Sequence, residues 1–100
     1  MDKESFESAA IWYANWNGHS SFPRYYGVRD AFIDSLTSEE KEIMTKLGYF
    51  DSSTKNGKRF EKAIQRTSGK DKVDADFYAM YNEAMGKASS QAEPDQPGNC

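Results

Sequence analysis

Apolar residues recur every three or four positions along most of the chain, and this spacing is typical of one face of an α-helix. The first such stretch covers residues 5–17, with Asp2 or Ser5 as its capping residue, and it ends at Gly18. The spacing returns over residues 26–36. The pattern therefore predicts two helices in the first third of the chain.

The segment between these helices allows two interpretations. Residues 17–24 contain Gly, Pro, Ser and Asn, which is typical of a loop, and residues 25–27 then form an irregular entry into the next helix. Residues 22–28 could instead pair as a short strand. No other segment alternates apolar and polar residues for long enough to predict a strand.

A third helix carries its own start and stop signals. Thr37 and Glu40 have the spacing of a capping box, and Gly48 supplies the left-handed residue that ends a helix. The buried stripe between them is predicted to be Ile43, Met44 and Leu47.

Two further helices follow a polar turn at residues 51–57. The first of them ends near Gly69. The second begins at Asp71 or Asp74, because acidic residues cap helix starts, and it ends at Gly86.

The expected fold is therefore all-α: a compact bundle of four to five short helices that forms one domain over residues 1–86. A disordered polar tail is expected over residues 87–100, which hold no aromatic and no branched aliphatic side chain. Aromatic residues make up 14% of the chain, so the core is expected to be built largely from rings.

The composition limits the cellular setting. The only cysteine, Cys100, cannot form an internal disulfide, and no apolar run approaches the roughly 18 residues of a membrane span. The first residues are charged, unlike a signal peptide. We therefore expect a small, acidic, cytoplasmic protein that has no membrane segment.

Catalysis and metal binding find little support. His19 lies beside Ser20 and Ser21, but no nucleophile-elbow sequence surrounds them, so we predict no catalytic residues and no enzyme activity. The carboxylates of residues 71–76 are explained by helix capping, and the turn at residues 51–57 lacks the ligand pattern of a calcium loop. No metal site and no cofactor are predicted.

The aromatic residues of the first third point to protein binding. They outnumber what one face of a short helix normally buries, and Trp, Tyr and Arg are the side chains that anchor protein interfaces. The predicted binding residues are Trp12, Trp16, Arg24, Tyr25, Tyr26 and Arg29. The leading hypothesis is a small regulator or inhibitor of a larger complex, of the kind carried by phages and mobile elements, and a second copy of the chain is an alternative partner.

Nucleic-acid binding is the alternative function. Residues 55–72 hold seven basic and two acidic residues, a local charge of +5 in a chain whose formal net charge is −3. A basic helix over residues 58–67 could neutralise phosphates, and with the preceding helix it has the outline of a helix-turn-helix motif. The candidate residues are Lys55, Lys58, Arg59, Lys62 and Arg66.

Overall fold

The computed structural model describes residues 1–18 and 22–92, and within these residues it contains five α-helices and no strand. The helices are α1 (Lys3–Ala14), α2 (Phe22–Asp34), α3 (Ser38–Lys46), α4 (Lys55–Thr67) and α5 (Asp76–Ala92). The predicted all-α class is confirmed, and the alternative of a short strand over residues 22–28 is wrong.

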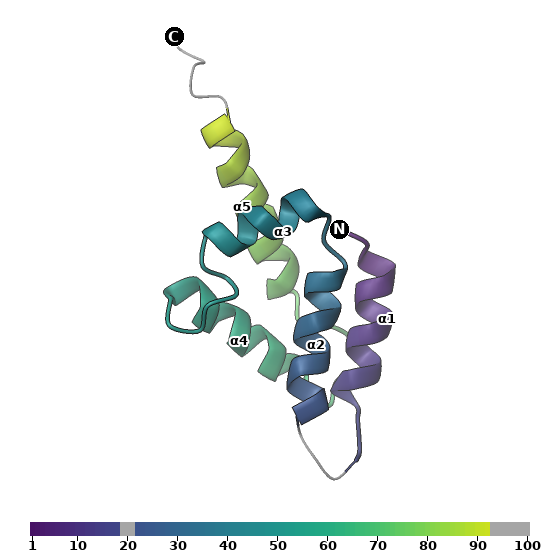
Figure 1. The fold of residues 1–100 in the computed structure, drawn as a ribbon. Coiled ribbons are helices and arrows are strands. Elements are labelled where there is room, and N and C mark those ends of the chain that lie inside the picture. The colour runs from purple at the N-terminus through teal and green to yellow at the C-terminus, as the bar shows by residue number, and fades with distance from the viewer. Residues whose placement is uncertain (19–21, 93–100) are drawn as a thin grey trace.

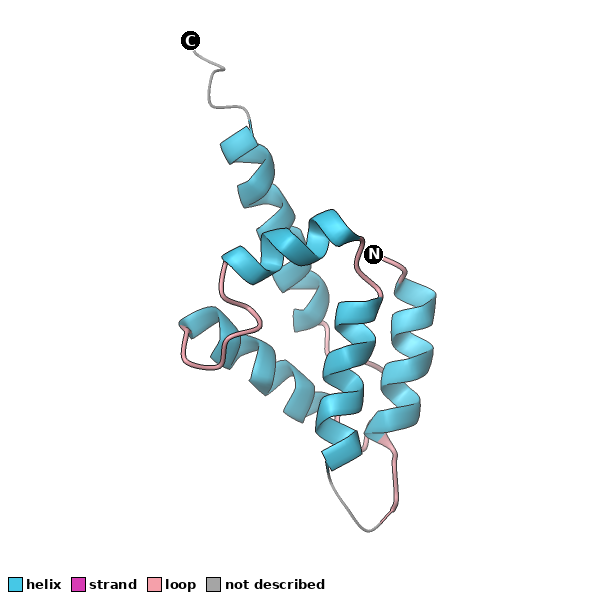
Figure 2. Ribbon diagram, viewed as in Figure 1, coloured by secondary structure: helices cyan, strands magenta, loops and turns pink. Residues whose placement is uncertain are grey.

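The helices form two layers that are bridged at one end (Figure 1). α1 and α2 lie side by side and antiparallel, and α4 lies on the other side of α2. α3 crosses the top of the bundle and packs chiefly against α5, which runs behind it and extends beyond the other helices. Residues 35–37 form a short connection between α2 and α3, whereas the loops before and after α4 are longer (Figure 2).

The core is a cluster of four phenylalanines, one from each of the four long helices. Phe6 meets Phe32 and Phe77 edge to face, with ring centroids 5.3 and 5.1 Å apart, and Phe60 lies 5.3 Å from Phe32. All four rings are at most 3% exposed. The centre of the core is therefore aromatic, as predicted, and the fully buried Met44 of α3 belongs to the same cluster.

The predicted helix signals around α3 are confirmed atom by atom. The Thr37 side chain accepts a hydrogen bond from the Glu40 backbone N–H (3.1 Å), and the Glu40 carboxylate accepts one from the Thr37 N–H (2.9 Å). Gly48 has a φ of 86°. Beyond it the Tyr49 N–H donates to the Met44 carbonyl (3.1 Å), which completes a Schellman motif.

The capping residues of the other helices are only partly as predicted. Asp2, rather than Ser5, caps α1, and its side chain accepts a hydrogen bond from the Ser5 N–H. Asp74, rather than Asp71, lies at the start of α5, where its carboxylate accepts a hydrogen bond from the Asp76 N–H at 3.2 Å.

Two helices begin earlier than predicted. α2 starts at Phe22, because Pro23 falls in the first turn, where a helix tolerates proline. α4 starts at Lys55, because Thr54 caps it by accepting a hydrogen bond from the Gly57 N–H. Glycine is required at position 57, since a Cβ there would lie 1.8 Å from the Asp51 carbonyl oxygen.

The predicted stop at Gly86 is wrong. α5 continues through this glycine to Ala92, so the predicted start of the tail at residue 87 falls within the helix. Glycine costs an interior helix position only about 1 kcal/mol, which the packing of Met80 and Ala84 against the core offsets. The part of the predicted tail over residues 93–100 lies outside the described residues.

One carboxylate ties three separate elements together. Glu40 of α3 accepts hydrogen bonds at Oε2 from the Met1 amine (3.1 Å) and from the hydroxyl of Tyr81 on α5, and its Oε1 lies 2.9 Å from the same amine as an ion pair. Partial burial alone would raise the pKa of Glu40, but these bonds and the one from the Thr37 N–H together lower it to about 2. The N-terminus, α3 and α5 are therefore held by a single charged group.

Candidate functional site

Two large apolar side chains are strongly exposed in the described part of the chain. Trp12 of α1 is 60% exposed and Tyr26 of α2 is 43% exposed. The sequence predicted both as binding residues, and the adjacent helices α1 and α2 carry them.

Trp12 lies within a cluster of rings at the C-terminal end of α1. Its ring centroid is 4.9 Å from that of Tyr13 and 5.5 Å from that of Trp16. Trp16 is half-buried and covers Gly18, where an added Cβ would lie 2.5 Å from the indole Nε1. Trp12 is thus the most exposed ring of this cluster, and it contacts the half-buried Trp16.

The other predicted binding residues connect helices. The Arg24 Nη1 donates to the Trp16 carbonyl at 2.6 Å, which ties the start of α2 to the end of α1. The Tyr25 hydroxyl donates to Glu61 of α4 at 3.3 Å, and its pKa is raised by burial and by that carboxylate. Arg29 lies 3.5 Å from Asp30. These three side chains are half-buried and make contacts within the domain.

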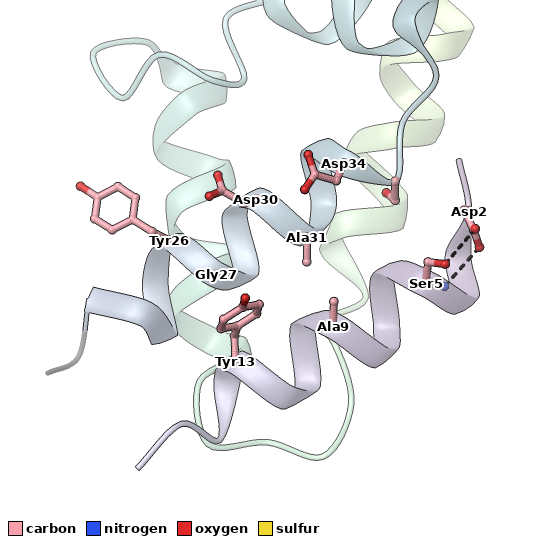
Figure 3. Close-up of a pocket in the computed structure, with 10 residues that line it drawn as sticks. Asp2, Ser5, Ala9, Tyr13, Tyr26, Gly27, Asp30, Ala31 and Asp34 are labelled. Carbon is pink, nitrogen blue, oxygen red and sulfur yellow. Dashed lines mark hydrogen bonds between the residues drawn. The ribbon is translucent and has the colours of Figure 1, made fainter. Parts of the chain in front are cut away.

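A groove of about 650 Å³ runs between α1 and α2 (Figure 3). α1 contributes Ser5, Ala9 and Tyr13, and its capping residue Asp2 lies at the groove as well. α2 contributes Tyr26, Gly27, Asp30, Ala31 and Asp34. The two tyrosines lie toward one end of the groove, and Asp2 and Ser5 lie at the other.

Gly27 sets the depth of this groove. An added Cβ at Gly27 would lie 2.2 Å from the Tyr13 ring, so the two helices approach closely there only because residue 27 has no side chain. Figure 3 shows the Tyr13 ring beneath this glycine. Ala9 and Ala31 continue the strip of small residues, which leaves the space above them open.

Carboxylates line the rest of the groove. Asp2 is held by hydrogen bonds from the Ser5 N–H and hydroxyl, and these bonds lower its pKa. Asp30 and Asp34 lie one helical turn apart near the end of α2, and both are exposed. No lysine or arginine lines this groove.

The basic helix predicted for nucleic acid is partly neutralised by α5. Arg59 donates to Asp76 at 2.7 and 2.9 Å and to Glu83 at 2.8 and 3.1 Å. Arg66 donates to Asp74 at 3.1 Å. Hydrogen bonds from Arg59 lower the pKa of Asp76.

The three lysines of the basic helix remain available to a ligand. Lys55, Lys58 and Lys62 are exposed and border a groove of about 340 Å³. The predicted pairing of the two central helices as a helix-turn-helix motif finds no counterpart in the packing, because α3 packs chiefly against α5 and the connection over residues 47–54 is long.

Sequence reasoning missed the acidic groove and the ion pairs of Arg59. A signal for the groove was present, because Tyr26, Asp30 and Asp34 are spaced by four and must share one ridge of a helix. No local signal connects Arg59 with Glu83, which lies 24 residues further along the chain.

The described residues contain no group of three or more His, Cys, Asp or Glu side chains arranged to hold a metal ion. His19, Ser20 and Ser21 lie outside the described residues. Within the described ranges, no helix combines the length and the apolar character that crossing a bilayer requires.

The fold defines a small five-helix domain, within the described residues, with an aromatic and acidic groove on one face. Comparison with protein-family models, with curated proteins and with solved structures found no match to this chain.

Proposed function

We propose that the protein is a non-enzymatic binding module that holds a partner protein against the outer face of α1 and α2. The supporting observation is the exposure of two large rings, Trp12 at 60% and Tyr26 at 43%, on adjacent helices. Rings of this size bury a large apolar area with little loss of conformational freedom, so Trp and Tyr dominate the energetics of protein interfaces.

The position of the rings favours an interface over a packing accident. Trp12 lies against Tyr13, and Tyr13 lines the same groove as Tyr26. A partner that covers Trp12 therefore lies next to Tyr13, one of the residues that line the groove. Neither Trp12 nor Tyr26 belongs to the buried core, so binding leaves the packing of the four phenylalanines unchanged.

Such a module acts by occupying a surface of its partner, as a regulator or inhibitor of a larger complex does. The cytoplasmic setting belongs to the same proposal and rests on the single cysteine of the sequence. An origin in a phage or mobile element stays a prediction from the size and the acidity of the chain.

Nucleic-acid binding is the second candidate, and the exposed ridge of Lys55, Lys58 and Lys62 favours it. It has less support than protein binding, because the two arginines of the same helix are engaged by carboxylates of the domain. A guanidinium already held by a carboxylate binds phosphate only at the cost of that ion pair.

A photo-crosslinking amino acid at position 12 tests the proposal in cells of the source organism. Lys46, which is exposed on α3, is the control position. We expect a defined partner to crosslink from position 12, where the crosslinking residue is itself a large aromatic ring, and not from position 46. Capture of this partner by co-purification with the natural chain should be lost in Trp12→Ser with the helical content unchanged. Equal crosslinking from both positions, or unchanged capture by Trp12→Ser, would contradict protein binding through this face.

A salt titration with labelled duplex and single-stranded DNA and RNA tests the second candidate. Binding that weakens steeply with salt and is lost in Lys58→Glu with Lys62→Glu would move nucleic-acid binding to first place. Absence of binding at low salt would rule out nucleic-acid binding as a function.

A further inference from the structure

The groove between α1 and α2 has a floor of small residues. Ala9, Gly27 and Ala31 leave about 650 Å³ of open space between the helices. The Tyr13 ring closes one end of this space, as Figure 3 shows. An occupant can therefore lay an aliphatic chain along the floor and end against a ring.

The charge of the groove limits what the occupant can be. Asp2, Asp30 and Asp34 line it, and none of the residues that line it is basic. Arg29 lies 3.5 Å from Asp30 but borders the separate groove between α2 and α4. Asp34 makes no ion pair in the part of the chain that the structure describes.

The carboxylates of α2 gain little within the isolated domain, because the pair of Asp30 with its sequence neighbour Arg29 is 3.5 Å long and the Asp30 side chain is 63% exposed. Asp30 and Asp34 are spaced by four, so their charges repel each other along one ridge. Asp34 is the last residue of α2, and the negative end of the helix dipole disfavours a carboxylate there. No basic residue occupies the last turn of this helix to compensate.

We infer that this groove binds a basic, arginine-containing segment of a partner protein, with the aliphatic stems of the arginines on Ala9 and Ala31 and their guanidinium groups on Asp30 and Asp34. Arginine fits both parts of the site, because its stem is apolar and its planar head forms paired hydrogen bonds with carboxylates. Its head also stacks on aromatic rings, and Tyr26 stands on the ridge that carries the two carboxylates. The inference rests on the proposed function and specifies the chemistry of the partner.

The test uses a fluorescently labelled amphipathic peptide of Leu, Ala and Arg in which the arginines recur at a spacing of four. Its matched control peptide carries Glu in place of every Arg. Fluorescence anisotropy is measured against the full chain, against Asp30→Asn with Asp34→Asn, and against Glu39→Gln with Glu42→Gln. Both double variants remove two exposed negative charges, but the second pair lies on α3, outside the groove.

We expect the arginine peptide to bind the wild-type chain and the glutamate peptide not to bind. The groove variant should lose about tenfold or more in affinity, and the α3 variant should change by less than about threefold, because long-range attraction alone is screened by salt. Amide shifts in NMR spectra should cluster on α1 and α2. Circular dichroism of both double variants should match that of the wild-type chain, because the replaced carboxylates are exposed.

Three outcomes would overturn the inference. The first is absence of binding of the arginine peptide to the wild-type chain. The second is an equal loss of affinity for this peptide in both double variants. The third is self-association of the free protein in sedimentation that Lys58→Glu with Lys62→Glu abolishes, because a second copy would then occupy the groove through its basic helix. If a partner still crosslinks from position 12 in any of these cases, the proposed function stands and only the chemistry of the partner is wrong.

Discussion

Replacing Glu40 with Gln tests whether one carboxylate holds the top of the bundle together. The substitution keeps the shape of the side chain but removes its charge. The amide nitrogen of Gln would then face groups that only donate, namely the Met1 amine or the Thr37 N–H, each of which now lies 2.9 Å from Oε1. The Tyr81 hydroxyl would also lose its charged acceptor.

The expected loss is about 2 kcal/mol in the free energy of unfolding at pH 7. A hydrogen bond to a charged group contributes about 1.5–3 kcal/mol. The lowered pKa gives an independent figure, because a shift from 4.5 to about 2 corresponds to about 3 kcal/mol, which screening by nearby solvent reduces to about 1–2 kcal/mol. For a domain of this size the melting temperature should fall by about 8–16 °C.

The pH dependence has a definite sign. Because the folded pKa of Glu40 lies below its unfolded value, its contribution is complete above pH 4.5 and is lost as the pH falls toward about 2. The difference between the wild-type chain and Glu40→Gln should therefore shrink over this range. Urea unfolding followed by circular dichroism at several pH values measures it.

The matched control is Glu39→Gln. Glu39 also lies in the first turn of α3 but is exposed, so this variant removes the same charge and retains the network. Its effect should stay below about 1 kcal/mol, the size of a dipole interaction at a helix start. Equal losses in both variants, or a Glu40→Gln loss that does not change with pH, would refute the role of the network.

Three further predictions can be checked by the same unfolding measurement. Gly57→Ala should cost about 3 kcal/mol or more, because the new Cβ would lie 1.8 Å from the Asp51 carbonyl oxygen. A Cβ at Gly86 meets nothing within 4 Å, so Gly86→Ala should stabilise α5 by up to about 1 kcal/mol. Equal effects of the two substitutions would mean that α4 does not pass this carbonyl closely. Arg59→Lys should cost about 1–2 kcal/mol, since an ammonium cannot form paired bonds to two carboxylates at once, and an unchanged stability would place the pairs in solvent. Asp30→Asn with Asp34→Asn should raise the stability of the free domain by about 0.5–1 kcal/mol, and a decrease would show that the exposed pair of Arg29 with Asp30 outweighs the repulsion on α2.

Helix ends were predictable where the interacting atoms lie within one turn. The hydrogen bonds at Thr37, Glu40 and Gly48 join groups three to five residues apart, so the spacing of these residues in the sequence is enough to predict both ends of α3. Pro23 and Gly57 were misleading, because both residue types usually interrupt helices. Each lies in the first turn of a helix, where proline removes no helical hydrogen bond and glycine allows a close approach of another segment.

The candidate site was less predictable, because exposure depends on contacts between helices. Trp12 and Trp16 are one turn apart, and nothing in their spacing says which one is covered. Trp16 lies just beyond the end of α1 and folds over Gly18, whereas Trp12 stays on the outer side of the helix. The sequence therefore predicted which segment carries exposed rings, but it did not predict that Trp12 rather than Trp16 is the exposed one.

The distribution of basic and acidic residues along the sequence differs from their distribution on the folded surface. The seven basic residues between Lys55 and Lys72 suggested one positive patch. In the fold Asp74, Asp76 and Glu83 lie against the two arginines of that stretch, so much of its excess charge is balanced within the domain. The carboxylates of the groove between α1 and α2 have no such balance among the residues that line it. We therefore expect a basic partner to be attracted to this groove, where the unbalanced carboxylates lie close to the exposed ring of Tyr26.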